Sequence, residues 1–391
     1  MKLENKKITD YKNIVVFQGL NSLRFIAAFL VVMHHSETIK KKNGIEDLEW
    51  FGLFRNGGNA VTFFFVLSGF LITYLLLKES DKTGSVSVKN FYLKRILRIW
   101  PLYFLLVFIG TIALPYVFQL LNVNYEMPYT LGQTWFYFVF FLPGLVTFFF
   151  GHHLLEPLWS IGVEEVFYLT WAPLFKMCKN KILILLIAVI ALKILLRILG
   201  YYFVSNALFN YVVNTFQFEA MAIGGLGAYF IYTKGSVFTG LSIFKTPFQV
   251  ILLLHLLVYI IFYSNIDNMY WNTFFKTPIL SSILIDLLFL YLIICVSVIE
   301  NSVVKFRSKL FSFLGEISYG IYMYHMLAIF ITIHFLTKYL LQMNPFTSHL
   351  MFYATVVSIT IGGASLSKYL FEDFFLNLKK KLGQEKQSGL N

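Results

Sequence analysis

The stretch NAVTFFFVLSGFLITYLLLK, residues 59–78, contains no charged side chain before its last residue, Lys78. A run of about 20 apolar residues is the length that an α-helix needs to cross the hydrocarbon core of a bilayer. Runs of this kind recur along the whole chain, because 58% of its 391 residues are hydrophobic and only 13% are charged. A typical soluble domain has about 25% charged residues. The sequence therefore predicts an all-α, polytopic membrane protein.

About ten segments have the length and composition of transmembrane helices. They are 17–37, 59–78, 101–121, 154–175, 182–200, 213–232, 247–264, 279–299, 313–335 and 348–370. An eleventh apolar segment, 133–150, is also long enough to cross, but it carries Pro143 and Gly144 in its middle. Such an interruption is tolerated at membrane depth where the segment is buried against protein.

The positive charges decide whether segment 133–150 crosses, because cytoplasmic loops are enriched in Lys and Arg. The basic clusters fall on one side of the membrane only if the chain crosses an even number of times between 101 and 176. We therefore expect 133–150 to form a re-entrant or interfacial helix, residues 122–153 to lie outside, and both termini to be cytoplasmic. The terminal lysines behind this prediction are Lys2, Lys6, Lys7, Lys12, Lys379, Lys380 and Lys381.

The same pattern predicts a single membrane domain over 1–391, with a core of about 17–372 and short cytoplasmic tails. The formal net charge of +12 lies in the loops between apolar segments. We attribute it to orientation in the bilayer and expect no nucleic-acid partner. The two cysteines, Cys178 and Cys295, have no metal-ligand spacing. We expect no metal site and no bound cofactor.

Ionisable residues inside a bilayer are costly and mark function by default. Arg24 lies within the first predicted helix, and eleven residues later comes His35. At about 100° per residue, eleven residues return the chain to within about 20° of the same face, whereas His34 points about 80° away. His35 and Arg24 therefore share one stripe of the helix. The alternative is that both histidines make ordinary polar contacts.

Arg95 and Arg98, within RILRIWPLY (95–103), are spaced to share one face of a helix. They precede Pro101, which suits the first turn of the helix predicted at 101–121. A helix N-terminus beside arginine side chains is a natural phosphate site. The alternative is that this pair only anchors the cytoplasmic side.

Three further groups of polar residues are candidates. LWSIGVEEVFY (158–168) places Glu164 and Glu165 near the predicted outer interface, one turn from Tyr168, and paired carboxylates can orient a histidine or bind sugar hydroxyls. Glu219 lies in another apolar segment. Ser318, Tyr322 and His325 recur at the spacing of one helix face. We expect Arg197 to reach the interface and leave it out of the site.

Taken in order, these segments resemble the acyltransferase 3 family of bacterial membrane O-acyltransferases, from about Gly19 to Glu372. The resemblance is carried by the arginine and histidine of the first helix, the glycine-rich run at 57–71, the arginine pair, the WSIGVEEVFY segment, and SYGIYMYH (318–325). One departure is Thr62, where the family often has an aspartate.

The resemblance implies transfer of an acyl group, with acetyl expected, from cytosolic acyl-coenzyme A to a hydroxyl of a cell-surface or exported carbohydrate at the bacterial cytoplasmic membrane. On this hypothesis His35 is the general base or a transient acyl carrier, Arg24 positions it or stabilises negative charge, and Glu164 orients it or the acceptor. Arg95 and Arg98 would hold the donor's phosphates, on the side opposite to His35 and the glutamates. Supporting or acceptor roles fall to Glu165, Tyr168, Glu219, Ser318, Tyr322 and His325.

Two other classes of function remain open at this point. A polysaccharide exporter or other transporter also uses buried charges, but it predicts internal pseudo-symmetry, which the sequence does not show. A non-catalytic subunit of a glycan-export system is the second alternative. The sequence does not specify the acceptor sugar, the acyl group, the oligomeric state, or whether transfer is direct or passes through a covalent intermediate.

Overall fold

The structure, a computed structural model, describes residues 10–120, 123, 127–266, 278–306 and 308–378. Every regular element in these ranges is helical, as the sequence predicts. The terminal lysines at positions 2, 6, 7 and 379–381 lie outside the described residues. Helices α1 (Leu20–Lys42) and α7 (Leu158–Met177) carry the predicted histidine and glutamate motifs.

The chain divides into two compact units, and each is described by itself. Unit 1 comprises Met1–Thr38, Asp47–Val86 and Leu174–Glu316, and unit 2 comprises Ile39–Glu46, Ser87–Pro173 and Ile317–Asn391. The interpretation of the whole chain as a single domain stays a prediction.

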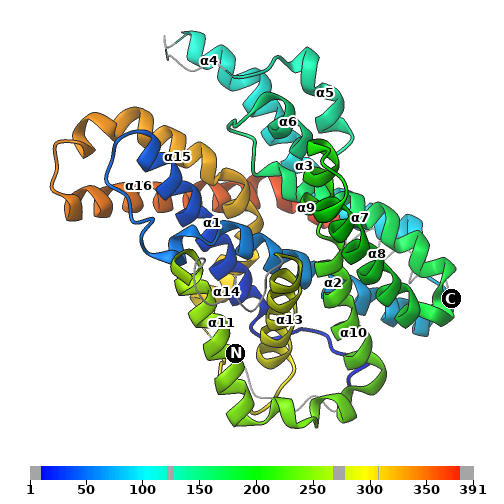
Figure 1. The fold of residues 1–391 in the computed structure, drawn as a ribbon. Coiled ribbons are helices and arrows are strands. Elements are labelled where there is room, and N and C mark those ends of the chain that lie inside the picture. Colours follow the sequence, from blue (N-terminus) through cyan, green and yellow to red (C-terminus); the bar gives the residue numbers. More distant parts are fainter. Residues whose placement is uncertain (1–9, 121–122, 124–126, 267–277, 307, 379–391) are drawn as a thin grey trace. The chain divides into compact units, whose positions relative to one another are not determined.

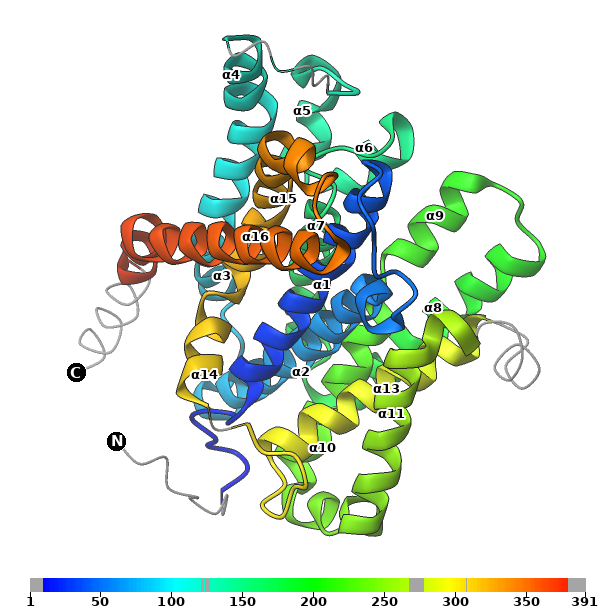
Figure 2. The same ribbon diagram turned by 90° about the vertical axis from the view of Figure 1, so that its left-hand side faces the viewer.

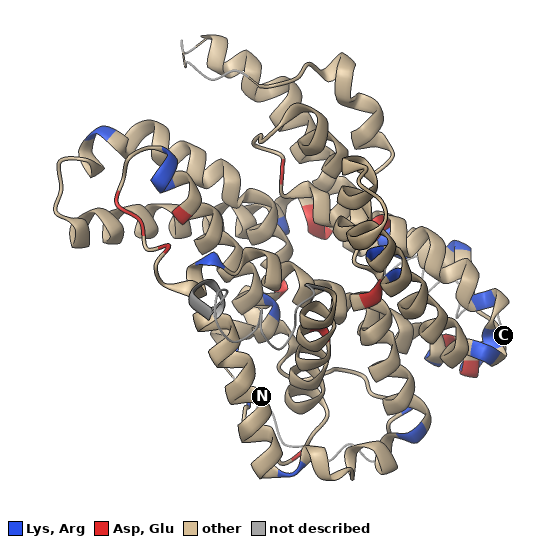
Figure 3. Cartoon of the chain, viewed as in Figure 1, with Lys and Arg blue, Asp and Glu red and all other residues tan. Residues whose placement is uncertain are grey.

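Unit 1 contains most of α1 and seven further α-helices among the described residues. They are α2 (Gly57–Thr83), α8 (Ile182–Tyr202), α9 (Ala207–Thr215), α10 (Phe218–Thr239), α11 (Thr246–Ile266), α13 (Pro278–Ser297) and α14 (Lys309–Glu316). Charged residues are sparse along these helices, and α11 carries none between its bounds (Figure 3). Helices α2 and α10 lie side by side (Figure 1).

The contact between α2 and α10 depends on two glycines. A Cβ atom added at Gly69 would lie 1.9 Å from the carbonyl oxygen of Met221, and one added at Gly224 would lie 2.0 Å from that of Val66. The backbones of the two helices therefore touch, as small residues allow in membrane bundles. Gly69 lies in the glycine-rich run at 57–71, and the structure identifies Gly224 as its partner on α10.

Unit 2 is built around a long helical rod. Helix α3 (Val88–Phe108) continues through the π-helix η2 (Ile109–Ala113) into α4 (Leu114–Leu120), as Figure 2 shows. Helix α7 packs along this rod, and the Tyr92 hydroxyl donates a 2.7 Å hydrogen bond to the Leu169 carbonyl. Helices α15 (Ser318–Leu340) and α16 (Pro345–Ser367) lie side by side (Figure 1), and α16 continues into the π-helix η5 (Lys368–Glu372).

The segment 133–150 is not one helix. It forms α5 (Leu131–Val139) and α6 (Pro143–Phe150), which at 1.5 Å per residue are about 14 and 12 Å long, too short to cross. Between them Phe141 has a φ of 56°, and its carbonyl oxygen would be 2.5 Å from a Cβ added at Gly162. This agrees with the prediction that the segment does not span the bilayer.

Six helices in the described ranges are long and apolar enough to cross a membrane. They are Gly57–Thr83, Val88–Leu120, Lys179–Tyr202, Ile279–Ser297, Ser318–Leu340 and Pro345–Leu378, and Thr246–Phe262 is a shorter apolar helix. The count of ten crossings is therefore not confirmed. Helices α1, α7 and α10 fall outside this set, and each carries ionisable side chains such as Arg24, Glu164 and Glu219, which lower its mean hydropathy.

Two predicted boundaries are wrong. The helix expected to begin at Pro101 begins at Val88, where the Ser87 side chain accepts a hydrogen bond from the Asn90 amide. Pro101 therefore lies inside α3, and the arginine pair does not flank a helix N-terminus. The crossing expected at 213–232 is interrupted between α9 and α10.

We expect Gly69→Ala and Gly224→Ala each to destabilise the protein, because the added methyl group would collide with a backbone carbonyl that cannot rotate away. Overpacking of this kind costs about 1–3 kcal/mol or more. Thermal unfolding of the purified protein in detergent measures the effect. Gly58→Ala, on the same helix with nothing within 4 Å of the new Cβ, is the matched control. Equal melting temperatures for all three variants would contradict the account of this contact.

Candidate active site

Unit 2 joins the predicted arginine and glutamate motifs in one network. The indole N–H of Trp100 on α3 donates a 2.8 Å hydrogen bond to Glu165 Oε2 on α7. One turn further along α7, the Tyr168 hydroxyl donates a 2.8 Å hydrogen bond to Glu164 Oε2. The guanidinium of Arg95 lies 5.5 Å from the centre of the Tyr168 ring, a cation–π contact. Arginine, aromatic ring and carboxylates thus form one continuous chain of contacts.

The glutamates lie closer to the arginine than the sequence suggested. Glu165 contacts Trp100, five residues or about 7.5 Å along α3 from Arg95. Trp100 itself is about 18 Å from the start of a rod about 50 Å long, which spans Val88–Leu120. The expectation that the arginines and the glutamates lie toward opposite faces is therefore wrong. The error follows from the register of α7 against α3, which no motif spacing fixes.

Glu165 has one oxygen with no partner. The residue is 3% exposed, and Oε1 forms no hydrogen bond with any described residue. A buried acceptor left without a donor costs about 1–3 kcal/mol. Such a group in a native structure calls for an explanation, such as a water molecule or a ligand that donates to it.

The two arginines of the pair differ in exposure. Arg95 is half-buried, and its guanidinium also lies 5.5 Å from the centre of the Phe91 ring. Arg98 is exposed. The first therefore packs against two aromatic rings, while the second is exposed to solvent.

Helix α15 supports this network with buried polar residues. The Tyr322 hydroxyl lies 2.7 Å from Ser160 Oγ and donates a 2.8 Å hydrogen bond to the Pro157 carbonyl, which ties α15 to the start of α7. Ser318 is 6% exposed and His325 is fully buried, with Nδ1 2.5 Å from the Tyr322 carbonyl of its own helix. These contacts of the Tyr322 hydroxyl fix the position of α15 against the start of α7.

Unit 1 holds the predicted catalytic pair. Arg24 and His35 lie on the single helix α1, as predicted, and an Arg24 guanidinium N–H donates a 3.2 Å hydrogen bond to Asn21 Oδ1. A Cβ added at Gly57 would lie 2.4 Å from His34 Cδ2, so the His34 ring packs on the start of α2. The two histidine rings are 5.3 Å apart. His34 therefore packs against the start of α2, and the catalytic role of His35 stays a prediction.

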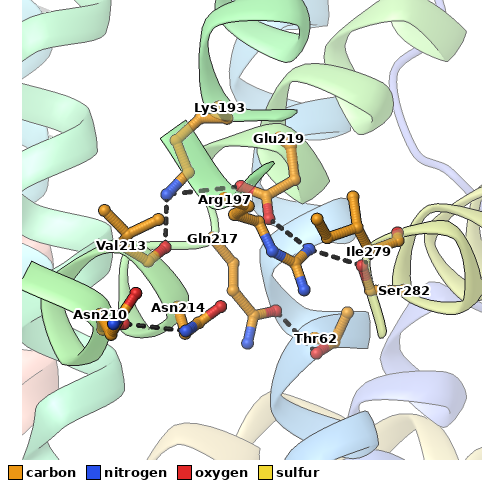
Figure 4. A network of polar contacts seen from close by, with 10 residues as sticks. All are labelled: Thr62, Lys193, Arg197, Asn210, Val213, Asn214, Gln217, Glu219, Ile279 and Ser282. Carbon is orange, nitrogen blue, oxygen red and sulfur yellow. Dashed lines mark hydrogen bonds and ion pairs between the residues drawn. The ribbon is translucent and has the colours of Figure 1, made fainter. Parts of the chain in front are cut away.

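Glu219 belongs to a separate buried network in unit 1 (Figure 4). Its Oε1 accepts a 3.1 Å hydrogen bond from the guanidinium of Arg197, and its Oε2 lies 3.8 Å from the ammonium of Lys193. Arg197 also contacts Ser282 Oγ at 2.5 Å, and Lys193 donates to the Val213 carbonyl at 2.6 Å. The carboxylate is thus neutralised by two cations from α8.

Sequence reasoning missed the partner of Glu219. Arg197 does not reach the membrane interface, because only 12% of its side chain is exposed and it points to Glu219. The signal was present, since Lys193 and Arg197 are four residues apart and share one face of α8. Next to this network the Thr62 hydroxyl donates a 2.8 Å hydrogen bond to Gln217 Oε1 (Figure 4).

The two units contain different parts of the predicted site. Unit 2 brings together Arg95, Glu164, Glu165 and Tyr168, and unit 1 contains Arg24, His35 and Glu219. The pairing of His35 with Glu164 stays a prediction. Among the described residues no group of three or more His, Cys, Asp or Glu side chains could hold a metal ion.

The fold and its buried ion pairs define a multi-pass, all-helical membrane protein with ionisable side chains in its interior. The sequence pattern of the acyltransferase 3 family, an acyltransferase domain, matches residues 17–368. Because the match covers most of the chain, the protein belongs to the acyltransferase 3 family.

Curated relatives match over part of the chain. A provisionally named O-acetyltransferase of Staphylococcus aureus strain COL is 31% identical over 172 residues, 42% of this chain and 26% of the relative. The peptidoglycan O-acetyltransferase OatA of Listeria monocytogenes is 28% identical over 193 residues, 47% of this chain and 28% of the relative. The matches thus cover about a quarter of these relatives. No solved structure matches the chain significantly.

Proposed function

We propose that this protein is a membrane O-acetyltransferase that moves an acetyl group from acetyl-coenzyme A to a hydroxyl of a cell-surface or exported carbohydrate. The observation that carries the proposal is the unbroken chain of contacts from Arg95 through Tyr168 to Glu164. It places a cation suited to phosphate beside carboxylates that can hold polar groups of a substrate. Membership of an acyltransferase family and the O-acetyltransferase names of the relatives support the acetyl group and the acceptor hydroxyl.

The donor would bind through its phosphates to Arg95 and Arg98. A guanidinium forms two parallel, charge-assisted hydrogen bonds to phosphate, which fix orientation as well as charge. The packing of Arg95 against two aromatic rings pre-organises that end of the site. The acyl-bearing arm of the donor would then extend along α3 toward Trp100 and Glu165, whose Oε1 is available to accept a hydrogen bond from it.

The proposed chemistry is acyl transfer from sulfur to oxygen. His35 takes the proton of the acceptor hydroxyl while the hydroxyl oxygen attacks the thioester carbonyl carbon. The C–S bond then breaks, and the same proton passes to the leaving thiolate, so that free coenzyme A and the ester are the products. In the two-step alternative His35 carries the acyl group before the hydroxyl attacks. Arg24 stabilises the negative charge that develops on the carbonyl oxygen.

The setting that we propose is the bacterial cytoplasmic membrane, with both termini on the cytoplasmic side. The donor site would then face the cytosol, where acyl-coenzyme A is made. The name peptidoglycan O-acetyltransferase belongs to the longer relatives. For this chain we propose a carbohydrate acceptor without naming the polymer.

The donor site is tested by Arg95→Ala and Arg98→Ala. Charge-assisted hydrogen bonds are worth about 1.5–3 kcal/mol each, so each substitution should weaken binding of acetyl-coenzyme A by about tenfold or more. Calorimetry on the purified protein measures this affinity. Lys94→Ala, an exposed neighbouring cation, is the control and should bind normally. Unchanged affinity for both arginine variants would leave the pair as a topology anchor only.

The catalytic assignment is tested by comparing the two adjacent histidines. We expect His35→Ala to abolish acetyl transfer while preserving expression and donor binding. His34→Ala should keep substantial activity per folded molecule, because its ring packs on Gly57 and points about 80° from the stripe of Arg24. The measurement is acetyl transfer by matched amounts of folded protein. An inactive His34→Ala with an active His35→Ala would refute the assignment.

A further inference from the structure

Unit 2 contains a pocket of about 610 Å³ where η2 and α4 face the segment that leads into α5. Thr111, Phe118 and Gln119 contribute to its wall from the rod, and Tyr129 and Thr130 contribute from the facing segment. Small-molecule sites typically have volumes of about 300–1,000 Å³. None of the candidate residues for the reaction lines this pocket, which we call the α4 pocket.

The rod changes its winding at the α4 pocket. Residues Ile109–Ala113 form a π-helix within an otherwise α-helical rod. Such single-turn bulges occur frequently at functional sites. Here Gly110 lets Leu155 approach so closely that an added Cβ would lie 2.6 Å from Leu155 Cδ2. The next residue, Thr111, lines the pocket and donates a 2.6 Å hydrogen bond to the Val107 carbonyl, which leaves its hydroxyl oxygen able to accept.

The chemistry of the wall favours one class of ligand. Among the described residues, those that line the α4 pocket are aromatic, aliphatic, hydroxyl-bearing or amide-bearing, and none of them is charged. An anionic group such as phosphate would lose its hydration there without a counter-charge, which is costly. A neutral sugar unit instead presents hydroxyls for Gln119 and Thr111 and an apolar ring face for aromatic side chains.

The side chain of Tyr129 contacts a buried histidine, His153. His153 is 5% exposed and lies outside the six candidate spans. Its Nδ1 accepts a 3.2 Å hydrogen bond from the Leu155 amide and lies 3.1 Å from the Tyr129 hydroxyl. Its Nε2 lies 3.3 Å from Thr147 Oγ1. Burial, with a smaller effect from His152, lowers the pKa of His153 to about 4. The ring is therefore neutral near pH 7, and the wall around Tyr129 is pre-organised.

The α4 pocket is remote from the proposed donor site along the rod. Thr111 follows Arg95 by 16 residues, or about 24 Å at 1.5 Å per residue. The charge parity of the sequence predicts that residues 122–153, which contribute Tyr129, lie outside the cell. A ligand that arrives from that side would be the acceptor rather than the cytosolic donor.

We propose that the α4 pocket binds a neutral sugar unit of the acceptor glycan. The proposal rests on the proposed function, because it assigns the pocket to the second substrate of that reaction. A bound unit there would hold the polymer near the protein without taking part in the chemistry. Its loss should therefore weaken the use of the acceptor and leave the donor unaffected.

Two conservative variants test the α4 pocket. Gln119→Ala and Thr111→Val each remove hydrogen-bonding capacity from the wall with little change to the core. Each lost hydrogen bond should raise the KM for a neutral β-1,4-linked N-acetylglucosamine tetramer by about three- to tenfold, with kcat and the KM for acetyl-coenzyme A unchanged. Tyr116→Ala is the matched control, because Tyr116 is 64% exposed on the same helix and does not line the pocket.

Calorimetry with the tetramer alone separates the two proposals. The folded wild-type protein should bind the tetramer, and the affinity should be lower in Gln119→Ala and Thr111→Val but unchanged in Tyr116→Ala. This result would support the sugar site even if the protein transferred no acetyl group. In that case the proposed function would be refuted, while the assignment of the α4 pocket as a sugar site would be supported. Normal acetyl transfer with wild-type acceptor KM and tetramer affinity in both pocket variants would overturn the sugar site and leave the proposed function intact.

Discussion

An ionisable side chain inside a bilayer must find a partner within the protein, because unpaired charge there is costly. The candidate residues obey this constraint in different ways. Glu219 is neutralised by Lys193 and Arg197, so its carboxylate is committed to holding three helices of unit 1 together. Glu165 accepts a hydrogen bond from Trp100 through Oε2, while its Oε1 has no hydrogen bond with a described residue. Glu219 Oε2 also lacks a hydrogen bond, but it lies 3.8 Å from the Lys193 ammonium. The two cations of α8 therefore distinguish Glu219, which belongs to a buried ion-pair network, from Glu165.

The helices can satisfy this constraint because their backbones approach closely. Gly69 and Gly224 bring α2 against α10, and Gly57 makes room for the His34 ring at the start of α2. The glycine-rich motif of the family therefore shapes the surface that packs against His34 on α1. At position 62 the chain has a threonine, which binds the Gln217 side chain instead of supplying a further charge.

Local features were predictable from the sequence, and long-range ones were not. The shared stripe of Arg24 and His35 depends only on helix geometry, and α1 is one helix as expected. The contact between Arg95 and Tyr168 depends on how α7 is aligned with α3, which motif spacing within either helix does not contain. The prediction that a helix begins at Pro101 is wrong, because proline is tolerated inside a membrane helix whose neighbours satisfy the freed backbone groups.

In the proposed function, one protein takes its acyl group on one face of the membrane and delivers it to a carbohydrate on the other. The most direct test uses the purified protein in sealed liposomes, sorted for a single orientation. Acetyl-coenzyme A labelled in the acetyl group is supplied on the face of the basic loops, and a neutral oligosaccharide on the opposite face. We expect labelled oligosaccharide in this arrangement, and none when the two substrates are exchanged. Label transfer only when both substrates share one face would contradict it.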